Sequence, residues 1–307
     1  MNAALPEPVI EVRDLAVAFD GWPALDGLSL DVFRGETLGV VGASGAGKST
    51  LMRTLLGLIP KRAGSVRVLG VDLGEASALE RRSVGRRCGA LFQQGALFSS
   101  LSVLDNVQFP MREYLSLSDR LRREVAMAKI EMVGLRPDDA HKLPSELSGG
   151  MTKRAALARA VALDPEILFL DEPTSDLDNI AADEFDSLIR TLRGTLGFTV
   201  FMVTHDLQSV GRICDRVAAI AERRIVFAGP LTAVAEARHA WVRAYFSGQR
   251  ASCAVACRTM RFTDGTASAF STNGRLSARL RRGGFRVDLL AARRREFWRD
   301  GGLCCSL

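Results

Sequence analysis

The 307-residue sequence has only three histidines and two tyrosines, and it lacks any apolar run long enough to cross a membrane. A membrane-spanning helix needs about 20 apolar residues, whereas the most apolar stretches here, 167–170 and 200–203, are short and flanked by polar residues. The first eight residues also lack the basic start and apolar core of a secretory signal. These absences argue against a chain that forms a membrane path itself, and they predict that it stays in the cytoplasm.

The cysteines predict neither a disulfide scaffold nor a metal site. Six are present, but their spacing fits neither a disulfide scaffold nor a four-ligand zinc site. Three residues separate Cys253 from Cys257, and Cys304 adjoins Cys305, yet no histidine lies near either pair. Free thiols in a reducing compartment are therefore predicted.

The positive charge is confined to one end of the chain. The net charge is +6, but residues 250–307 hold 12 of the 41 basic residues and only 4 of the 35 acidic ones. The body is therefore nearly neutral, which argues against a nucleic-acid face, and no nucleic-acid partner is expected. Beyond residue 249 the periodicity fades, so 249–307 is predicted to be a poorly ordered Arg-rich extension. Contact of this extension with anionic lipid is the alternative.

The body alternates apolar strands, glycine-containing loops and amphipathic helices. This order predicts an α/β domain over 8–248 with a mainly parallel sheet. Residues 9–19 and 25–33 alternate apolar and polar residues, like antiparallel edge strands, and a helical block is predicted at about 100–163. The other predicted strands are 36–41, 65–69, 88–92, 166–170, 199–203, 217–220 and 224–228, and the helices are 48–58, 120–133, 151–162 and 179–193, with short helices up to residue 246.

A glycine-rich loop carries the strongest chemical signal. It contains two glycines separated by four residues, then lysine and serine, between a predicted strand and a predicted helix. In this pattern backbone N–H groups and the positive helix end bind phosphates. Lys48 would reach the β- and γ-phosphates and Ser49 would ligate Mg²⁺, so binding of Mg-ATP is predicted. The loop comprises Gly42, Ala43, Ser44, Gly45, Ala46, Gly47, Lys48, Ser49 and Thr50.

A pair of carboxylates supplies the second part of the chemistry. The apolar segment 167–170 ends at Asp171 and Glu172. One carboxylate at the end of a buried strand can hold the metal while the next activates water. We therefore predict that Asp171 binds Mg²⁺ and that Glu172 is the general base, with ATP hydrolysis as the reaction.

The third part is a second helix start flanked by glycines. Leu147, Ser148, Gly149, Gly150 and Met151 open a predicted helix, and a helix N-terminus binds anions. One nucleotide does not need two such sites in one chain. Together the three segments resemble the ATPase subunits of ABC transporters, whose signature reads Leu-Ser-Gly-Gly-Gln, with Met151 departing from the glutamine.

The resemblance covers residues 9–247 and implies a P-loop NTPase fold with a RecA-like core, an antiparallel β subdomain and an inserted helical subdomain. It implies a head-to-tail dimer of two copies, in which Ser148, Gly149 and Gly150 contact the nucleotide of the partner. It also assigns roles to single residues. These are Phe19 stacking on adenine, Gln93 touching Mg²⁺ (with Gln94 as the adjacent alternative), 175–178 lying across the dimer interface, and His205 contacting the γ-phosphate and orienting Glu172.

The region after Gln93 is similar to one subgroup, the ATPases of Mla- or MCE-type lipid transporters. The run Gly95-Ala96-Leu97-Phe98 and the methionine at 151 carry this similarity. It implies a membrane permease, an MCE-domain lipid-binding protein, a small STAS-like subunit and a place at the cytoplasmic face of the inner membrane. The apolar run either receives a permease helix or packs inside the helical block.

Two other functions remain open. The same ATPase motifs are expected in the ATP-binding subunits of polar amino-acid uptake transporters, so this function is an alternative. A non-transport ABC ATPase acting on nucleic acid or ribosomes is disfavoured, because such proteins carry two fused cassettes or a long coiled-coil insertion and this sequence has neither.

Overall fold

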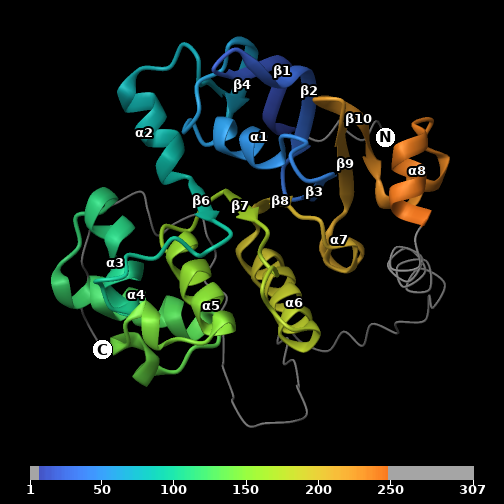
Figure 1. Cartoon of the computed structure of the whole chain (residues 1–307). Helices are drawn as coiled ribbons and strands as arrows, with labels where there is room; N and C mark the ends of the chain where they lie inside the picture. Colours follow the sequence, from blue (N-terminus) through green and yellow to red (C-terminus); the bar gives the residue numbers. More distant parts are fainter. Residues whose placement is uncertain (1–6, 248–307) are drawn as a thin grey trace, which may run out of the picture. The chain divides into compact units, whose positions relative to one another are not determined.

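The computed structural model describes residues 7–247, so the predicted extension at 249–307 lies outside the described residues. The described part contains two sheets and a group of helices (Figure 1). The strands are β1 (Pro8–Phe19), β2 (Trp22–Phe33), β3 (Thr37–Gly42), β4 (Ala63–Val68), β5 (Val71–Asp72), β6 (Cys88–Leu91), β7 (Ile167–Asp171), β8 (Thr199–Val203), β9 (Arg216–Ala221) and β10 (Arg224–Pro230). The helices are α1 (Lys48–Leu55), α2 (Ala78–Arg86), α3 (Val103–Tyr114), α4 (Asp119–Met132), α5 (Gly149–Ala160), α6 (Asn179–Leu196), α7 (Leu207–Ile213) and α8 (Ala240–Ser247), with 3₁₀ turns η1 (Pro137–His141), η2 (Pro144–Glu146) and η3 (Leu231–Glu236).

The smaller sheet is antiparallel and has the strand order β2-β1-β4-β5. β1 and β2 are joined by a two-residue turn in which Asp20 and Gly21 both have positive φ, 48° and 83°, as a tight hairpin turn requires. β1 was predicted to be an edge strand, but it lies inside the sheet because β4 pairs with its other side, with Ile10 opposite Val68. Local alternation reports only which face is buried, so it could not reveal this second partner.

The larger sheet has the order β10-β9-β3-β8-β7-β6 and is parallel except for β10. Every residue of β3, β7 and β8 is buried, as expected for parallel strands covered on both faces. The carboxyl ends of these three neighbouring strands meet at one edge of the sheet, where ligands bind in open α/β folds. The mainly parallel sheet predicted from the sequence is therefore present.

The helical block contains α3, α4 and α5, and α5 joins it to the larger sheet. α5 packs so closely on β6 that a Cβ at Gly89 would overlap the carbonyl oxygen of Ala160. Within residues 7–247, no helix combines the length and the apolar character that a membrane span needs.

Two helices, α2 and α7, were missed. α2 buries only Val84 and carries charge on its other faces, so its apolar period is weak. Its capping box, in which Ser77 and Glu80 each bind the other's backbone N–H, was the readable signal.

Candidate active site

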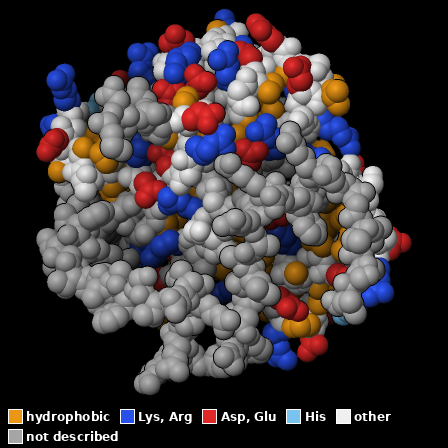
Figure 2. Space-filling view, turned by 180° about the vertical axis from the view of Figure 1, so that it is seen from behind, with side chains coloured by type: hydrophobic (Ala, Val, Ile, Leu, Met, Phe, Trp, Pro, Cys, Tyr) orange, Lys and Arg blue, Asp and Glu red, His pale blue; other side chains and the backbone are white. Residues whose placement is uncertain are grey.

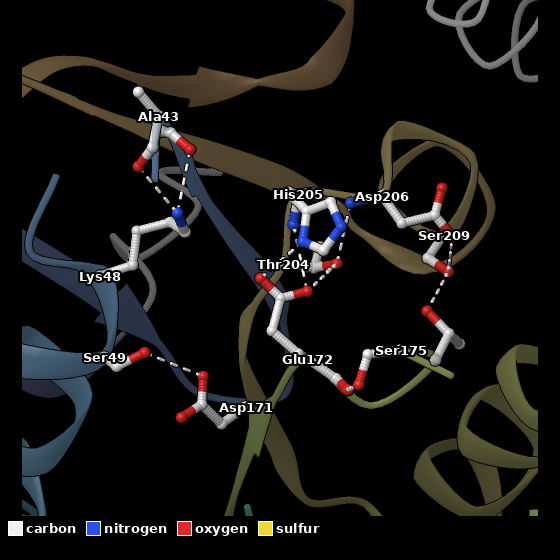
Figure 3. A network of polar contacts seen from close by, with 12 residues as sticks. Ala43, Lys48, Ser49, Asp171, Glu172, Ser175, Thr204, His205, Asp206 and Ser209 are labelled. Atoms are coloured by element: carbon white, nitrogen blue, oxygen red, sulfur yellow. Dashed lines mark hydrogen bonds and ion pairs between the residues drawn. The ribbon is translucent and has the colours of Figure 1, made fainter. Parts of the chain in front are cut away.

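Three loops meet at the carboxyl edge of the larger sheet. β3 leads into the glycine-rich loop, β7 ends at Asp171, and β8 ends at Val203. β8 lies between the other two strands, with Val203 opposite both Val40 and Asp171. The side chains of these loops therefore face a common region (Figure 3).

The glycine-rich loop wraps around its own lysine. Lys48 begins α1, and its Nζ donates to the carbonyl oxygens of Gly42 at 2.9 Å and Ala43 at 3.0 Å. The Nζ is buried, and burial lowers the pKa of Lys48, while the nearby carboxylates oppose this shift. Since its hydrogen-bond partners are neutral carbonyls rather than a carboxylate, its charge is free to bind phosphate.

Glycine is favoured at one position of this loop by its backbone conformation and by its packing. Gly47 has φ 99°, and a Cβ there would lie 2.6 Å from Cδ2 of Leu25. The loop therefore rests on β2. Phe19 is the last residue of β1, pairs with Trp22 across the hairpin turn and is 46% exposed. The predicted adenine-stacking residue thus lies at the end of the hairpin that contacts the loop.

The hydroxyl of Ser49 lies beside the first carboxylate of β7. Ser49 Oγ donates to Asp171 Oδ1 at 3.2 Å, and Asp171 is 2% exposed. Burial and the neighbouring Glu172 carboxylate raise the pKa of Asp171. A hydroxyl and one carboxylate fit Mg²⁺, which takes one or two protein ligands and completes its shell with phosphates and water. In the described residues no cluster of three histidine, cysteine or acidic side chains forms a stand-alone metal site.

The carboxylate of Glu172 is held by the loop that follows β8. It accepts hydrogen bonds from Thr204 Oγ1 at 3.2 Å and the backbone N–H of His205 at 3.3 Å. His205 Nδ1 lies 2.9 Å from Glu172 Oε1. The Glu172 side chain is 12% exposed and that of His205 is 69% exposed. The structure therefore brings Lys48, Asp171, Glu172 and His205 to one edge of the sheet.

The His205 loop is fixed by α7 and α8. Asp206 caps α7 and accepts a hydrogen bond from Ser209 Oγ at 2.9 Å, and Ser209 in turn contacts Thr174 Oγ1 at 3.2 Å. The hydroxyl of Tyr245, on α8, donates to the carbonyl of His205 at 3.4 Å. Contacts on two sides thus position the loop that holds the Glu172 carboxylate.

A buried ion pair joins α6 to α7 behind this loop. Asp186 is fully buried, and its Oδ2 lies 3.6 Å from Nη1 of Arg212, which also contacts Asp183. This separation is an ionic contact rather than a hydrogen bond. Burial raises the pKa of Asp186 to about 6, so the fold favours the protonated carboxyl group.

Replacement of Asp186 by asparagine is therefore expected to change how stability depends on pH. A carboxyl group whose pKa is raised by folding stabilises the folded state fully at pH values below its ordinary pKa of 3.8. This stabilisation is lost as the pH rises through about 6. The free energy of unfolding of Asp186→Asn, relative to the parent, should rise by up to about 3 kcal/mol between about pH 4 and about pH 7.5. Urea unfolding at both values measures this, with the half-exposed Asp183→Asn as control. A pH-independent difference would contradict it.

The predicted signature segment begins α5 and is open to solvent. Ser148 caps the helix by accepting the Met151 N–H at 3.3 Å, and Ser148 and Gly149 are exposed. A Cβ at Gly149 would lie 3.8 Å from the carbonyl of Asp176, so the helix start lies beside 175–178. In the described part of the chain, no hydrogen bond joins Ser148, Gly149 or Gly150 to the P-loop of the same chain.

Gln93 contacts the site through its backbone carbonyl. Its carbonyl accepts a hydrogen bond from Lys153. Gln93 and Gln94 are both exposed, so the choice between them stays a prediction. Sequence reasoning missed Lys153, Thr204 and Tyr245. Only Thr204 had a readable signal, its place between β8 and the predicted His205.

The fold and site are those of a P-loop nucleotide hydrolase, because one edge of a parallel sheet carries Lys48 of the P-loop, the buried Asp171 and the hydrogen-bonded Glu172. The second glycine-flanked helix start, at Ser148, is typical of one subset of this class. The comparisons with known proteins agree. Residues 25–175 match the family model described as ABC transporter. The chain belongs to the ATP-binding subunits of ABC transporters and is an ATP-binding, ATP-hydrolysing cassette.

Three relatives and one solved structure illustrate this membership. The intermembrane phospholipid transport ATP-binding protein MlaF of Haemophilus influenzae is 40% identical over 221 residues, 72% of this chain and 83% of the relative. The probable ribonucleotide transport ATP-binding protein mkl of Mycobacterium leprae is 36% identical over 241 residues, which are 78% of this chain and 69% of the relative. The methionine import ATP-binding protein MetN of Rhizobium etli is 41% identical over 232 residues, which are 75% of this chain and 63% of the relative. A dimeric ATP-binding cassette bound to ADP and phosphate, 27% identical, superposes with a TM-score of 0.66 over 72% of this chain and 98% of that chain.

Proposed function

We propose that the chain energises lipid transport between membranes by hydrolysing Mg-ATP, with Glu172 as the general base. The observation that carries the catalytic part is the support of the Glu172 carboxylate by Thr204 and His205, opposite Lys48. Phosphoryl transfer depends mainly on positioning and electrostatics, and the P-loop amides and Lys48 supply both. Ser49, Asp171 and Gln93 would hold Mg²⁺, which neutralises phosphate charge when bound.

A second copy of the chain completes the proposed site. Ser148, Gly149 and Gly150 lie at the start of α5, which no hydrogen bond in the described residues joins to the P-loop of the same chain, and a helix N-terminus binds anions. The similar solved cassette is a dimer. We therefore place these residues on the nucleotide of the partner, with Phe19 stacked on adenine.

The lipid cargo is proposed from the similarity to MlaF. The H. influenzae and Escherichia coli proteins of that name are 40% and 38% identical, and the chain covers 83% and 89% of their lengths. Both are named as intermembrane phospholipid transport proteins. The methionine at 151 and the apolar run at 95–98 favour the same subgroup. The proposed partners are a permease, an MCE-domain protein and a STAS-like subunit at the cytoplasmic face of the inner membrane.

Amino-acid uptake is the second candidate. The sequence predicts a polar amino acid, and the relative named for import of methionine, whose side chain is apolar, is 41% identical. The nucleic-acid alternative has less support. Acidic and basic side chains are interspersed on the face seen in Figure 2, in keeping with the nearly neutral body.

We propose that the permease docks on an apolar patch that follows Gln93 in the chain. Phe98 and Phe109 are 43% and 38% exposed, and their ring centroids are 4.6 Å apart. Ala96 is exposed, whereas Leu97 packs against the core. The exposure of Ala96 and Phe98 supports the prediction that this run receives a permease helix, whereas the packing of Leu97 supports the alternative of internal packing.

Purification of the tagged full-length chain from its native membrane in mild detergent tests this function. We expect mass spectrometry to find an MCE-domain protein, a multi-span permease and phospholipid. Recovery of a solute-binding protein with a different permease would replace the lipid cargo with a polar nutrient. Phe98→Asp should lose the permease, whereas Leu79→Asp, at an exposed leucine of α2, should retain it.

A further inference from the structure

Lys153 is a buried lysine that the proposed mechanism does not use. It lies in the second turn of α5 and is 5% exposed. Its Nζ donates to the carbonyl of Gln93, to the carbonyl of Glu172 at 3.1 Å and to Ser175 Oγ at 3.2 Å. An ammonium group has three N–H donors, so all of them are engaged.

The three acceptors belong to two loops, one after β6 and one between β7 and α6. Gln93 follows β6, Glu172 follows β7, and Ser175 lies in the segment beside the start of α5. Lys153 thus joins α5 to the loops at the carboxyl edge of the larger sheet.

We propose that Lys153 is a positioning residue for the proposed general base, holding the Glu172 peptide so that the placement of α5 sets the placement of the Glu172 carboxylate. This proposal rests on the role assigned to Glu172 above. It predicts that loss of the Lys153 ammonium slows turnover without weakening ATP binding.

The backbone of Glu172 explains why a clamp is needed. Its φ is 48°, a left-handed conformation that residues with a side chain adopt only when the surroundings impose it. Its N–H donates to the Val203 carbonyl at 2.8 Å. Its carbonyl accepts from Lys153 Nζ at 3.1 Å, from Ser175 Oγ at 2.8 Å and from the Ser175 N–H at 3.2 Å, and Lys153 is the one of these donors that belongs to α5. Release of the carbonyl would let the peptide rotate, and the carboxylate would move away from Thr204 and His205.

The charge around the ammonium is suited to this position. Burial lowers the pKa of Lys153, but Asp176, Glu172 and Asp171 oppose the shift. A neutral side chain of similar length would fill the volume, but it would remove the Lys153 donor from the partly buried Gln93 carbonyl and leave the Glu172 carbonyl with its Ser175 donors only.

The test compares Lys153→Met with Lys129→Met in the full-length chain. Lys129 is also a buried lysine, 6% exposed, and it is bonded to Asp164 at 2.7 Å in the helical block. Lys153→Met should lower kcat by about 10- to 100-fold while the Kd for ATP stays within about twofold, because misplacement of a reacting group affects the chemical step. Lys129→Met should leave kcat unchanged, and Lys153→Arg should restore part of the loss.

Ser175→Ala provides a milder variant that should fold if Lys153→Met does not, since it removes one hydroxyl. We expect a loss in kcat of about two- to fivefold, and the two substitutions should be non-additive because both act on the Glu172 carbonyl.

Glu172→Gln separates failure of this proposal from failure of the proposed function. If Glu172→Gln retains the parental kcat, the role of Glu172 itself is wrong. If Glu172→Gln abolishes turnover but Lys153→Met behaves like Lys129→Met, or the Ser175→Ala effect is absent or additive, the positioning role of Lys153 is overturned.

Discussion

Replacement of Glu172 by glutamine is expected to lower kcat for ATP hydrolysis by about 100- to 10,000-fold, the range that general base catalysis contributes. The amide keeps the shape of the side chain but cannot accept a proton. ATP affinity should stay within about twofold, because Lys48 and the P-loop amides are untouched. Size-exclusion chromatography with ATP should show a trapped dimer, since closure precedes hydrolysis in the proposed cycle.

Glu166→Gln is the matched control for this variant. Glu166 lies immediately before β7, at the opposite end of the strand from Glu172, and its carboxylate pairs with Arg34 and Arg87 at the surface. Its loss should leave kcat unchanged. A parental kcat in Glu172→Gln would show that another group activates the water.

Replacement of Lys48 by alanine is expected to weaken binding of ATP by about 10- to 100-fold, because a charge-assisted hydrogen bond to phosphate contributes about 1.5–3 kcal/mol. The loss should also appear with inorganic triphosphate, since Lys48 would contact only the phosphate chain. Isothermal titration calorimetry with both ligands in the presence of Mg²⁺ measures the effect.

Phe19→Ala distinguishes loss of phosphate contacts from general damage to the site. Its ring would stack on the base, so it should weaken ATP binding by about 1–3 kcal/mol and leave triphosphate binding unchanged. Unchanged ATP affinity in Lys48→Ala would contradict the assignment of the P-loop.

The parts of the site that depend on local sequence could be predicted. The P-loop and Asp171–Glu172 follow buried strands and are marked by residue types at fixed spacing, so their order along the chain places them at one sheet edge. The hydrogen bonds of Lys153 could not be predicted, because its three acceptors lie 60, 19 and 22 residues away and only the packing of α5 brings Lys153 to them.

The same limit applies to the fold. The strands 36–41 and 199–203 were readable from apolar runs, but the interior position of β1 depends on β4, which no local pattern of β1 reports. The domain boundaries at 8 and 248 and the helical subdomain at about 100–163 stay predictions.

The position of β3 has a consequence for the order in which the protein becomes active during synthesis. β3 ends by residue 42, yet its two neighbours in the sheet are β8 and β9, which begin at Thr199 and Arg216. Pairing over such long separations forms late, since the loop must first be closed. The P-loop therefore emerges early from the ribosome but gains its catalytic neighbours only when nearly the whole cassette has been made. A nascent chain that ends before β8 and β9 therefore lacks both strands that flank β3 in the complete site.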